Sequence, residues 1–501
     1  MKNRIKQYLL AASMCVGLTA CSDFFEPIPG VQFGLDETFA SKQRTEEYLN
    51  NVYSYVREVT DAIHPNTYGG IFTEASLDGA NRWNKTYAEW TNGSFNSASA
   101  QASEYFSKYY QAIAKASTFI QNVDKCTEAA ASTRGKWKSE ARALRAYYYF
   151  ELLRLYGPIP LIGEDPIPLD ASLEELIKER NSVDECVNFI ATELQSAIDS
   201  GDLLQRAGKA NLGRMDVATC MALKAKLYLY WASPLFNGNT DQASVKNKDG
   251  KQLFPQTEDN SKWTQARDAY ERFMTFATGQ GYKLTEVYTN GKLDPYASCR
   301  AAGEFFTTTW EAVDELIFVK LRDLYDYTYW VCPKFTDFQD TDVTGGGGYY
   351  TTQETVDLFF TKDGLTIEED PGYDKFEGIP GANNFTSGRY YDPNNPSRLY
   401  FDADKSKVLK QWKDREPRFY VNITYSGSIW LNEGKYNEEM RTDFTNGANG
   451  TCGKSKASGD CPDSGYLIRR GAKASNNNGS KHFSPVLRLA DMYLGYAEAL
   501  C

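Results

Sequence analysis

Small residues recur at helical spacing in three separate segments of this 501-residue chain. In each segment the positions i, i+4 and i+7 lie on one face of an α-helix, where small side chains let a neighbouring helix approach closely. This pattern restricts the fold strongly, because it requires helices packed face to face. The three sets, with one leucine among them, are Ser139, Ala143 and Ala146; Ala218, Ala222 and Ala225; and Ala490, Leu494 and Ala497.

Apolar periodicity and end signals predict the helices that carry these segments. Ser182 is expected to cap one helix, with Glu185 three residues later in the capping-box position. Gly157-Pro158 and Pro234 are expected to stop two others, because proline cannot continue a helix. The predicted helices are residues 44–61, 104–123 paired with 136–156, 182–200 paired with 215–233, and 262–278.

The small-residue spacing resembles that of helix B in tetratricopeptide repeats. Chance alanines on packed helices would give the same spacing, so it supports helical hairpins and leaves degenerate repeats open. Residues 237–479 are instead rich in Gly, Asn, Asp, Pro and Tyr, with short strands predicted at 315–321 and 419–425. We therefore expect a mostly α fold of helical hairpins with long irregular loops and a few short strands. Loops of this length are usually functional.

The N-terminus has the pattern of a secretory signal. Lys2, Arg4 and Lys6 precede a short apolar stretch at residues 8–19, too short to span a bilayer as a helix. The stretch ends in Leu-Thr-Ala-Cys, which resembles the bacterial lipobox, so Cys21 is the expected lipidation site and the first residue of the mature protein. Acyl chains on Cys21 would hold the protein at a membrane surface. An ordinary cleaved signal, in which Cys21 is incidental, is the alternative.

Charge and histidine content exclude several classes of function. The 55 Lys and Arg against 66 Asp and Glu give a formal charge of −11, and no basic stripe interleaved with aromatics is present, so no nucleic-acid partner is expected. His64 and His482 are the only histidines, which excludes an H-E-x-x-H zinc site. Aromatic residues, in contrast, make up 14% of the chain. No cofactor or metal is expected.

The cysteines give a weaker signal. Cys186 and Cys220 lie in apolar helical patterns and are expected in the core. Cys452 and Cys461 bracket a Gly/Ser/Lys-rich loop, and a disulfide between them is a candidate in an exported protein.

Two loop features resemble ligand sites only weakly. The four glycines at 345–348 lack the Lys-Ser/Thr of a phosphate loop, so a flexible tip is expected there. Asp337, Asp340 and Asp342 could bind Ca²⁺ through their oxygens, but they lack the EF-hand register, and a solvated acidic loop is the preferred interpretation.

Five segments, in order along the chain, together resemble the RagB/SusD family. One helix passes into a Tyr-Gly-Pro-x-Pro turn, and a second, Tyr-rich helix ends in Ser-Pro-Leu-Phe-Asn-Gly. The others read FTKDGL, WKDREPRFY and LRLADMYLGYAEAL, and Glu416 stands where the family more often has Asp. The segments are residues 139–162, 213–238, 360–365, 412–420 and 487–500.

The resemblance implies a lipid-anchored, surface-exposed lipoprotein of a Gram-negative outer membrane. Family members capture glycans on a scaffold of tetratricopeptide-like units, cover a SusC-like TonB-dependent barrel transporter, and are not enzymes. The expected organisation is a signal with lipobox at 1–20, an N-terminal helical region at 21–240, a loop-rich region at 241–480, and the start of a C-terminal helical region at 481–501. Family chains continue beyond this last helix, so the chain looks truncated.

Two clusters in the loops are candidate glycan-binding residues. Sugars present apolar ring faces and hydroxyl rims, so their sites combine flat aromatic rings with Asp, Asn or Arg side chains. The first cluster follows the position where the family carries ligand-contacting loop residues, and packing against the helices is the alternative for each ring. The clusters are Asp78, Asn81, Arg82, Trp83 and Trp90, and Tyr325, Tyr327, Tyr329 and Trp330.

A surface-anchored glycoside hydrolase on the same scaffold, or a protein-interaction scaffold, remains as an alternative function. Carboxylates are abundant, and the sequence alone singles out no acid–base pair.

Overall fold

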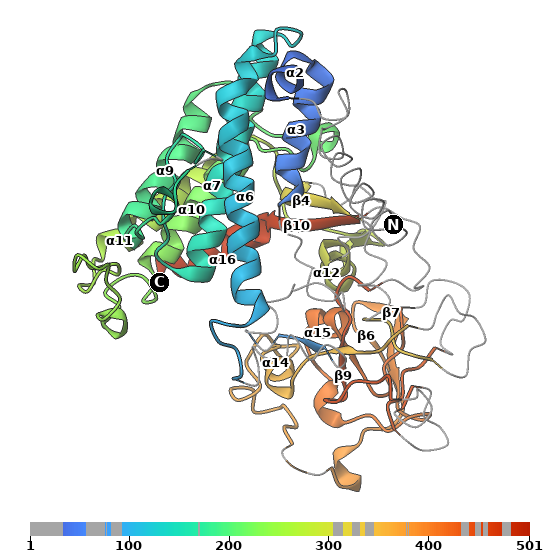
Figure 1. The fold of residues 1–501 in the computed structure, drawn as a ribbon. Coiled ribbons are helices and arrows are strands. Elements are labelled where there is room, and N and C mark those ends of the chain that lie inside the picture. Colours follow the sequence, from blue (N-terminus) through green and yellow to red (C-terminus); the bar gives the residue numbers. More distant parts are fainter. Residues whose placement is uncertain are drawn as a thin grey trace, which may run out of the picture.

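The computed structural model has a helical part and a loop-rich part with short strands (Figure 1). The predicted signal at 1–20 and Cys21 lie outside the described residues. The structure describes residues 34–56, 76, 78–81, 93–168, 171–303, 314–322, 331–335, 345–376, 378, 380–431, 440–445, 452–453, 459–472 and 482–501. The helices of the helical part are α2 (Leu35–Ala40), α3 (Lys42–Ser54), α6 (Ala100–Asn122), α7 (Ala131–Tyr156), α8 (Leu173–Leu176), α9 (Val183–Asp199), α10 (Val217–Ala232), α11 (Ser261–Gly279) and α16 (Leu489–Leu500).

The helical part is an array of antiparallel neighbours. α6 packs against α7, and α9 packs against α10, which confirms the two predicted hairpins. α7 also packs against α9, and α10 against α11, so the hairpins stack on one another. α16, from the other end of the sequence, packs against α11 and α10.

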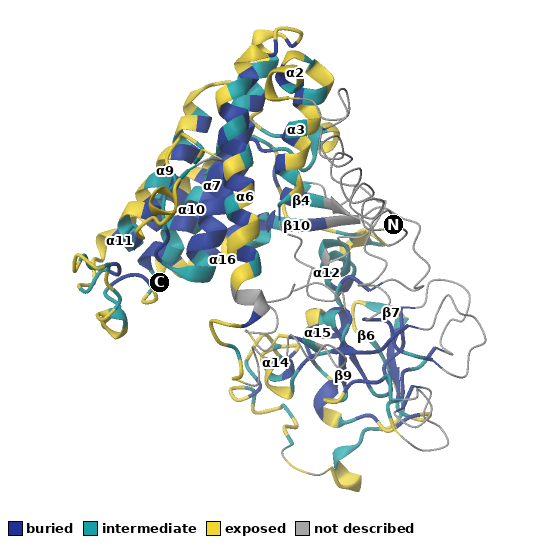
Figure 2. Ribbon diagram, viewed as in Figure 1, coloured by how far each residue is buried: buried dark blue, intermediate teal, exposed yellow. Residues whose placement is uncertain are grey.

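Small residues allow this close packing in two of the three predicted segments. Ala143 and Ala146 on α7, and Ala222 and Ala225 on α10, are completely buried. Figure 2 shows dark blue, buried stretches on both helices. The aromatic run that follows Ala146 is also buried. The alanine spacing therefore identifies the packing faces of these two helices.

The third predicted face, on α16, is wrong. Leu494 is 72% exposed, and the buried positions are instead Leu489, Met492, Gly495 and Ala499. A Cβ at Gly495 would lie 2.2 Å from the Tyr270 hydroxyl oxygen on α11, so the two helices meet closely at this glycine. One glycine, and not the Ala490 and Ala497 spacing, sets the approach of α16.

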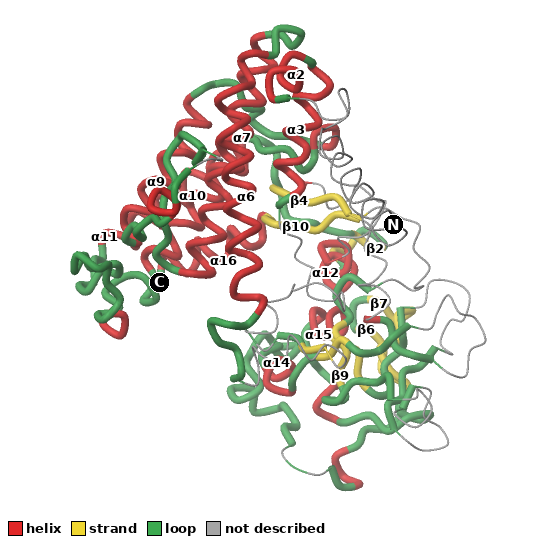
Figure 3. Tube along the Cα trace, viewed as in Figure 1, coloured by secondary structure: helices red, strands yellow, loops and turns green. Residues whose placement is uncertain are grey.

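The loop-rich part is built on short antiparallel strands (Figure 3). Its four-stranded sheet has the order β1-β5-β9-β8, and two hairpins pair β2 with β3 and β6 with β7. Short 3₁₀ turns lie at Ala382–Asn384 and Lys410–Trp412 in this part, and at Val123–Lys125, Lys209–Asn211 and Thr240–Gln242 after helices of the helical part. The strands are β1 (Ala80–Asn81), β2 (Tyr288–Thr289), β3 (Lys292–Leu293), β5 (Tyr349–Tyr350), β6 (Arg389–Asp392), β7 (Asn395–Asp402), β8 (Ile423–Tyr425) and β9 (Tyr466–Ile468), with helices α12 (Pro295–Gly303), α14 (Gln353–Asp357) and α15 (Pro417–Asn422).

A further strand pair lies beside the helices. β4 (Leu316–Arg322) confirms the predicted strand and pairs antiparallel with β10 (His482–Arg488), which leads directly into α16. Phe318 of β4 packs edge-on against Tyr147 of α7, with 6.0 Å between ring centroids. Lys320 donates to the carbonyl oxygens of Ser54 and Val56, at 2.6 Å each. Segments far apart in the sequence are thus fastened together at this strand pair.

The predicted strand at 419–425 is only half correct. Residues Pro417–Asn422 form α15, and only Ile423–Tyr425 is a strand. Glu416 is the N-cap residue, and Pro417 occupies the first turn, where its missing N–H has no helical partner to lose. The alternating apolar residues of this segment predict a strand, so they do not indicate the short helix.

Candidate functional site

The structure describes two of the predicted glycan-binding residues, Asp78 and Asn81. Asp78 is exposed and accepts a hydrogen bond from the Ser76 hydroxyl at 2.8 Å. Asn81 lies on β1. The remaining predicted residues lie outside the described part of the chain: Arg82, Trp83, Trp90, Tyr325, Tyr327, Tyr329 and Trp330. Their roles stay predictions.

The strand of the first cluster forms one edge of the four-stranded sheet. Ala80 pairs with Tyr350 and Asn81 with Tyr349, so β1 lies beside β5. Tyr350 in turn pairs with Leu467 of β9, which places β5 between β1 and β9. The sheet therefore fixes the backbone that leads into the first cluster.

The chain that follows the second cluster contacts the same segment. The N–H of Gly347 donates to the Cys332 carbonyl at 2.9 Å, and the N–H of Gly345 donates to the Pro333 carbonyl at 3.0 Å. Residues 345–350 thus bond both to β1, through Tyr349 and Tyr350, and to residues 332–333, through Gly345 and Gly347. The structure brings together backbone segments that adjoin the two predicted clusters, although these segments are far apart in the sequence.

 Asn81 of the first segment and Cys332 of the second are 251 positions apart.

The four glycines at 345–348 are not an exposed tip, so that prediction is wrong. All four are buried. Gly347 has a φ of +57°, and a Cβ there would lie 2.9 Å from the Asp460 carbonyl oxygen and 3.2 Å from the Lys334 nitrogen. Lys334 and Asp460 also form an ion pair across this contact. The glycines let two neighbouring backbones pack closely against the segment.

A small buried core includes residues on both sides of this contact. Val331, Phe335 and Tyr349 belong to one buried cluster with Trp430 and Met440. Phe335 and Trp430 meet edge-on, with 6.4 Å between their ring centroids. Residues immediately after the second predicted cluster are therefore anchored in a core, which is what a preformed binding site requires.

The cysteines in this region are buried. Cys452 is completely buried, Cys461 is 5% exposed, and the disulfide between them stays a prediction. Cys332 lies in the same cluster as Cys452, and burial, together with the Cys452 thiol, raises the pKa of Cys332. Cys186 and Cys220 are completely buried in the helical part, as expected.

Two segments that carry the family resemblance, residues 360–365 and 412–420, bond to each other in the loop-rich part. The Lys362 N–H donates to the Asp414 carbonyl at 2.8 Å, and the Glu416 N–H donates to the Phe360 carbonyl at 3.0 Å. The Glu416 carboxylate also accepts from the Phe360 N–H at 2.9 Å. The glutamate that departs from the family pattern therefore makes a local structural contact.

Two concave clefts flank Tyr373 beside these segments. One has a volume of about 360 Å³, and its lining includes Gln353, Asp357 and Tyr373. The other, of about 310 Å³, has a charged lining that includes Lys410 and Asp414. No local sequence signal predicts these clefts, because their walls come from distant segments that meet only in the fold.

A third cavity, in the helical part, has a different character. It has a volume of about 420 Å³, and its mostly apolar lining includes Phe106, Tyr110, Leu176 and Ile177. Such a lining offers few partners for sugar hydroxyls. We therefore do not assign it to the candidate site.

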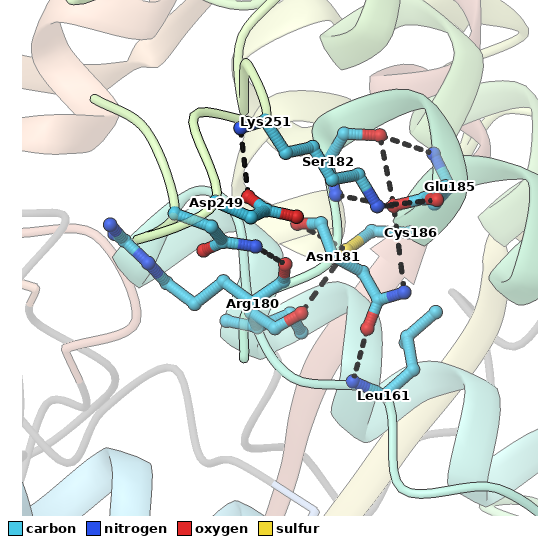
Figure 4. Close-up of polar contacts among 10 residues, drawn as sticks. Leu161, Arg180, Asn181, Ser182, Glu185, Cys186, Asp249 and Lys251 are labelled. Carbon is cyan, nitrogen blue, oxygen red and sulfur yellow. Dashed lines mark hydrogen bonds and ion pairs between the residues drawn. The ribbon is translucent and has the colours of Figure 1, made fainter. Parts of the chain in front are cut away.

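Polar contacts at the start of α9 are structural (Figure 4). The Ser182 hydroxyl accepts from the Glu185 N–H at 3.3 Å, and the Glu185 carboxylate accepts from the Ser182 N–H at 2.7 Å, which confirms the predicted capping box. Lys251 reaches the same carboxylate at 2.7 Å, and the Asn181 side chain accepts from the Leu161 N–H at 3.0 Å. These groups fasten two loops to the helix.

The described residues contain no group of three or more His, Cys, Asp or Glu side chains placed to hold a metal ion. Asp337, Asp340 and Asp342 lie outside them. Among the described helices, none is both long enough and apolar enough to cross a bilayer.

Two family profiles match the chain in separate regions. The profile described as "SusD family" matches residues 315–501, and the one described as "Starch-binding associating with outer membrane" matches residues 32–229. The chain belongs to the SusD/RagB family. The resemblance expected from the five sequence segments is thereby confirmed.

A known relative is similar to part of this SusD/RagB chain. A SusD-like protein of Bacteroides ovatus is 27% identical over 175 residues, which are 34% of this chain and 30% of that protein. The matched region thus spans less than a third of that relative's length.

Solved structures share the fold at low sequence identity. The structure named BT4246 has a TM-score of 0.69 at 24% identity and covers 92% of this chain and 78% of its own. A SusD-like protein from Bacteroides fragilis gives 0.64 at 21% identity, with 93% and 77% covered. Surface glycan-binding protein A from Bacteroides uniformis gives 0.52 at 13% identity, with 92% and 76% covered. The predicted mostly α, SusD-like fold is confirmed.

Proposed function

We propose that this SusD/RagB protein is a non-catalytic, cell-surface lipoprotein that captures a glycan and delivers it to a SusC-like TonB-dependent barrel in the outer membrane. The observation that carries the proposal is the bonding of one segment, residues 345–350, to both β1 and residues 332–333. This arrangement supports a single binding face, because it joins segments adjoining both predicted clusters. The glycan-binding name of a structural relative, and the outer-membrane description of one matching profile, point the same way.

The chemistry of the two clusters suits sugars. Aromatic rings such as Trp83 and Trp330 would stack on apolar sugar faces, while Asp78, Asn81 and Arg82 would bond the hydroxyl groups. Tyrosine and tryptophan lose little conformational entropy on binding, because each has only two side-chain torsions. A buried core beneath residues 331–335 and Tyr349 would hold such rings in place.

Affinity electrophoresis tests glycan binding. The full chain is run through gels that contain soluble starch, β-glucan, xylan or mannan, and retardation by at least one polysaccharide is expected. Trp83→Ala and Trp330→Ala should reduce that retardation, whereas Tyr288→Ala, at a 60% exposed ring on the β2–β3 hairpin, should not. Full retardation of both tryptophan variants would remove these clusters from the binding face.

Reducing-end release separates binding from hydrolysis. Incubation of the protein with the polysaccharide that retards it should release no reducing ends. Sustained release would support the hydrolase alternative and overturn the non-catalytic assignment.

Anchoring and partnership have separate tests. Cys21→Ser should move the protein out of the membrane fraction, because acylation of that cysteine supplies the proposed anchor. Continued membrane association of the variant would refute the lipid anchor. Affinity purification of the wild-type protein from its own outer membrane should recover a TonB-dependent barrel, and recovery without one would refute the delivery role.

A further inference from the structure

The larger of the two Tyr373 clefts combines aromatic, aliphatic and polar groups in one concave surface. Its volume is about 360 Å³, within the range of small-molecule sites. The lining also lies apart in the sequence from both predicted glycan-binding clusters. Its principal residues are Gln353, Asp357, Ile367, Tyr373, Phe376 and Gln411.

The Tyr373 ring is held in place by a buried arginine. Arg415, only 3% exposed, donates to the Tyr373 hydroxyl at 2.7 Å, and that hydroxyl donates to the Gln411 carbonyl at 2.5 Å. Arg415 also donates to the carbonyl oxygens of Val356 and Phe359, at 2.7 Å each, which ties the ring to the end of α14. A ring fixed in this way loses little further freedom when a ligand stacks on it.

The polar groups of the cleft are also oriented in advance. The Gln353 amide donates to the Asp357 carboxylate at 2.8 Å, and its own oxygen accepts from the Tyr466 hydroxyl at 2.7 Å. The second carboxylate oxygen of Asp357 has no hydrogen-bond partner among the described residues. Asp357 and Lys375 are the charged groups in the cleft lining, and their charges cancel.

We infer that this cleft binds a neutral sugar residue, with its apolar face against Tyr373 and its hydroxyls on Asp357 and Gln353. The inference rests on the proposed function and adds a sugar-binding site outside the two predicted clusters. A balanced charge favours an uncharged polyol over a phosphate or carboxylate ligand. The combination of fixed rings with an acceptor and an amide is the chemistry that sugar recognition needs.

The position of the cleft relates it to the proposed binding face. Gln353 lies four residues after Tyr349, and Tyr349 pairs with Asn81 on β1. Four residues span at most about 14 Å of extended backbone. The cleft therefore lies near the end of β5, the strand that pairs with β1.

The electrophoresis described above tests this inference with different variants. Tyr373→Ala should weaken binding of the polysaccharide that retards the wild type by about two- to tenfold, the range expected for an aromatic contact. Asp357→Ala should weaken it by a similar factor, because a hydrogen bond to a sugar hydroxyl is lost. Tyr373→Phe keeps the ring and should retain most of the affinity, and Tyr288→Ala serves as the matched surface control.

The outcomes separate this inference from the proposed function. If Trp83→Ala loses affinity while Tyr373→Ala and Asp357→Ala bind like the wild type, the cleft is not a sugar site and the proposed function stands. If no polysaccharide retards the wild type, the proposed function fails and the cleft assignment fails with it. Melting temperatures of all variants identify any that misfold, and Asp357→Ala, which leaves the Arg415 contacts intact, carries the test if Tyr373→Ala does not fold.

Discussion

Buried arginines are used differently in the two parts of the molecule. In the helical part, Arg145 of α7 is completely buried and donates twice to the Glu193 carboxylate of α9, at 2.8 and 2.5 Å, and once to the Ser117 hydroxyl of α6 at 3.0 Å. In the loop-rich part, the buried arginines Arg415 and Arg469 donate mainly to backbone carbonyls.

The difference follows from where the backbone hydrogen bonds go. Inside a helix each carbonyl already has its partner four residues along, so a buried arginine there must find a side-chain acceptor. Irregular loops leave carbonyls such as those of Phe359 and Ile429 without a regular partner, and burial of those groups is costly unless a side chain supplies a donor. Arginines thus substitute for secondary structure in the loop-rich part.

Removal of Glu193 should have the largest effect on stability. Glu193→Ala leaves the Arg145 guanidinium buried without its counter-ion, and loss of one partner of a buried ion pair costs about 3–5 kcal/mol. The free energy of unfolding should fall by that amount, measured by urea denaturation followed by circular dichroism. Glu193→Gln keeps hydrogen-bond acceptors and should cost less. Equal stability of Glu193→Ala and the wild type would mean that the ion pair does not support the helical array.

Arg415→Met should destabilise the loop-rich part selectively. The methionine fills similar space but leaves the Phe359 carbonyl without its donor and the Val356 carbonyl with only the Phe359 N–H at 3.4 Å, at a cost of about 1–3 kcal/mol for a buried unsatisfied group. Hydrogen exchange should accelerate in residues 353–376 and stay unchanged in α7 and α10. Acceleration in both parts alike would show that the two parts unfold as one unit, contrary to the comparison above.

Two aspartates that cap helices should respond to pH in opposite directions. Asp216 is completely buried at the start of α10 and accepts from the Thr219 N–H at 2.7 Å. Burial raises the pKa of Asp216 to about 6, since hydrogen bonding does not compensate for it. The folded state therefore holds its proton more tightly than the unfolded state does, and this residue makes stability fall by roughly 2–3 kcal/mol as the pH rises from about 4 to about 6.

Asp294 caps α12 in the loop-rich part with the opposite result. Burial alone would raise its pKa, but the fork of two 2.9 Å hydrogen bonds from Arg398 and the Ala297 N–H outweigh burial and lower the pKa to about 2. Its contribution, roughly 2 kcal/mol, is present above about pH 4 and is lost as the pH falls towards 2. Melting curves against pH should therefore flatten in the range 4–6 for Asp216→Asn and below 4 for Asp294→Asn. Unchanged pH profiles would contradict both assignments.

Local sequence signals were sufficient for most of the helical part. The capping box of Ser182 and Glu185, the stop at Gly157, and the alanine spacing of α7 and α10 each act within a few residues, and each is confirmed. The failure at α16 has the same origin, because the spacing does not reveal that Tyr270 of α11 packs on Gly495.

The loop-rich part depends on contacts between distant segments. The four glycines predicted as a flexible tip are buried, with Gly347 packed between Lys334 and Asp460, and the Tyr373 cleft needs residues 353–376 and 409–415 to meet. Neither arrangement leaves a periodic pattern in the sequence. The aromatic clusters predicted for glycan binding were chosen by composition and family resemblance, and the structure adds only the backbone pairing beside them.

The smallest expected effect on stability concerns an exposed ion pair between a loop and a helix. Lys251, in a loop, pairs at 2.7 Å with Glu185 at the start of α9, and their side chains are 38% and 43% exposed. The lysine hydrogen bond is the main cause that lowers the pKa of Glu185, with the Ser182 N–H second.

Lys251→Ala should reduce stability by less than about 1 kcal/mol, because solvent screens exposed pairs and the capping box keeps half of the carboxylate contacts. The loss should shrink further as salt is added, since added ions screen the pair already in the wild type. Ser182→Ala removes the cap itself and should cost about 1 kcal/mol with little dependence on salt. Thermal melting of the two variants at low and high ionic strength compares these contributions directly. A larger, salt-independent loss of stability for Lys251→Ala would mean that the lysine positions its loop through packing of its aliphatic stem. Side-chain burial, as in the helical core, would then hold this loop in place.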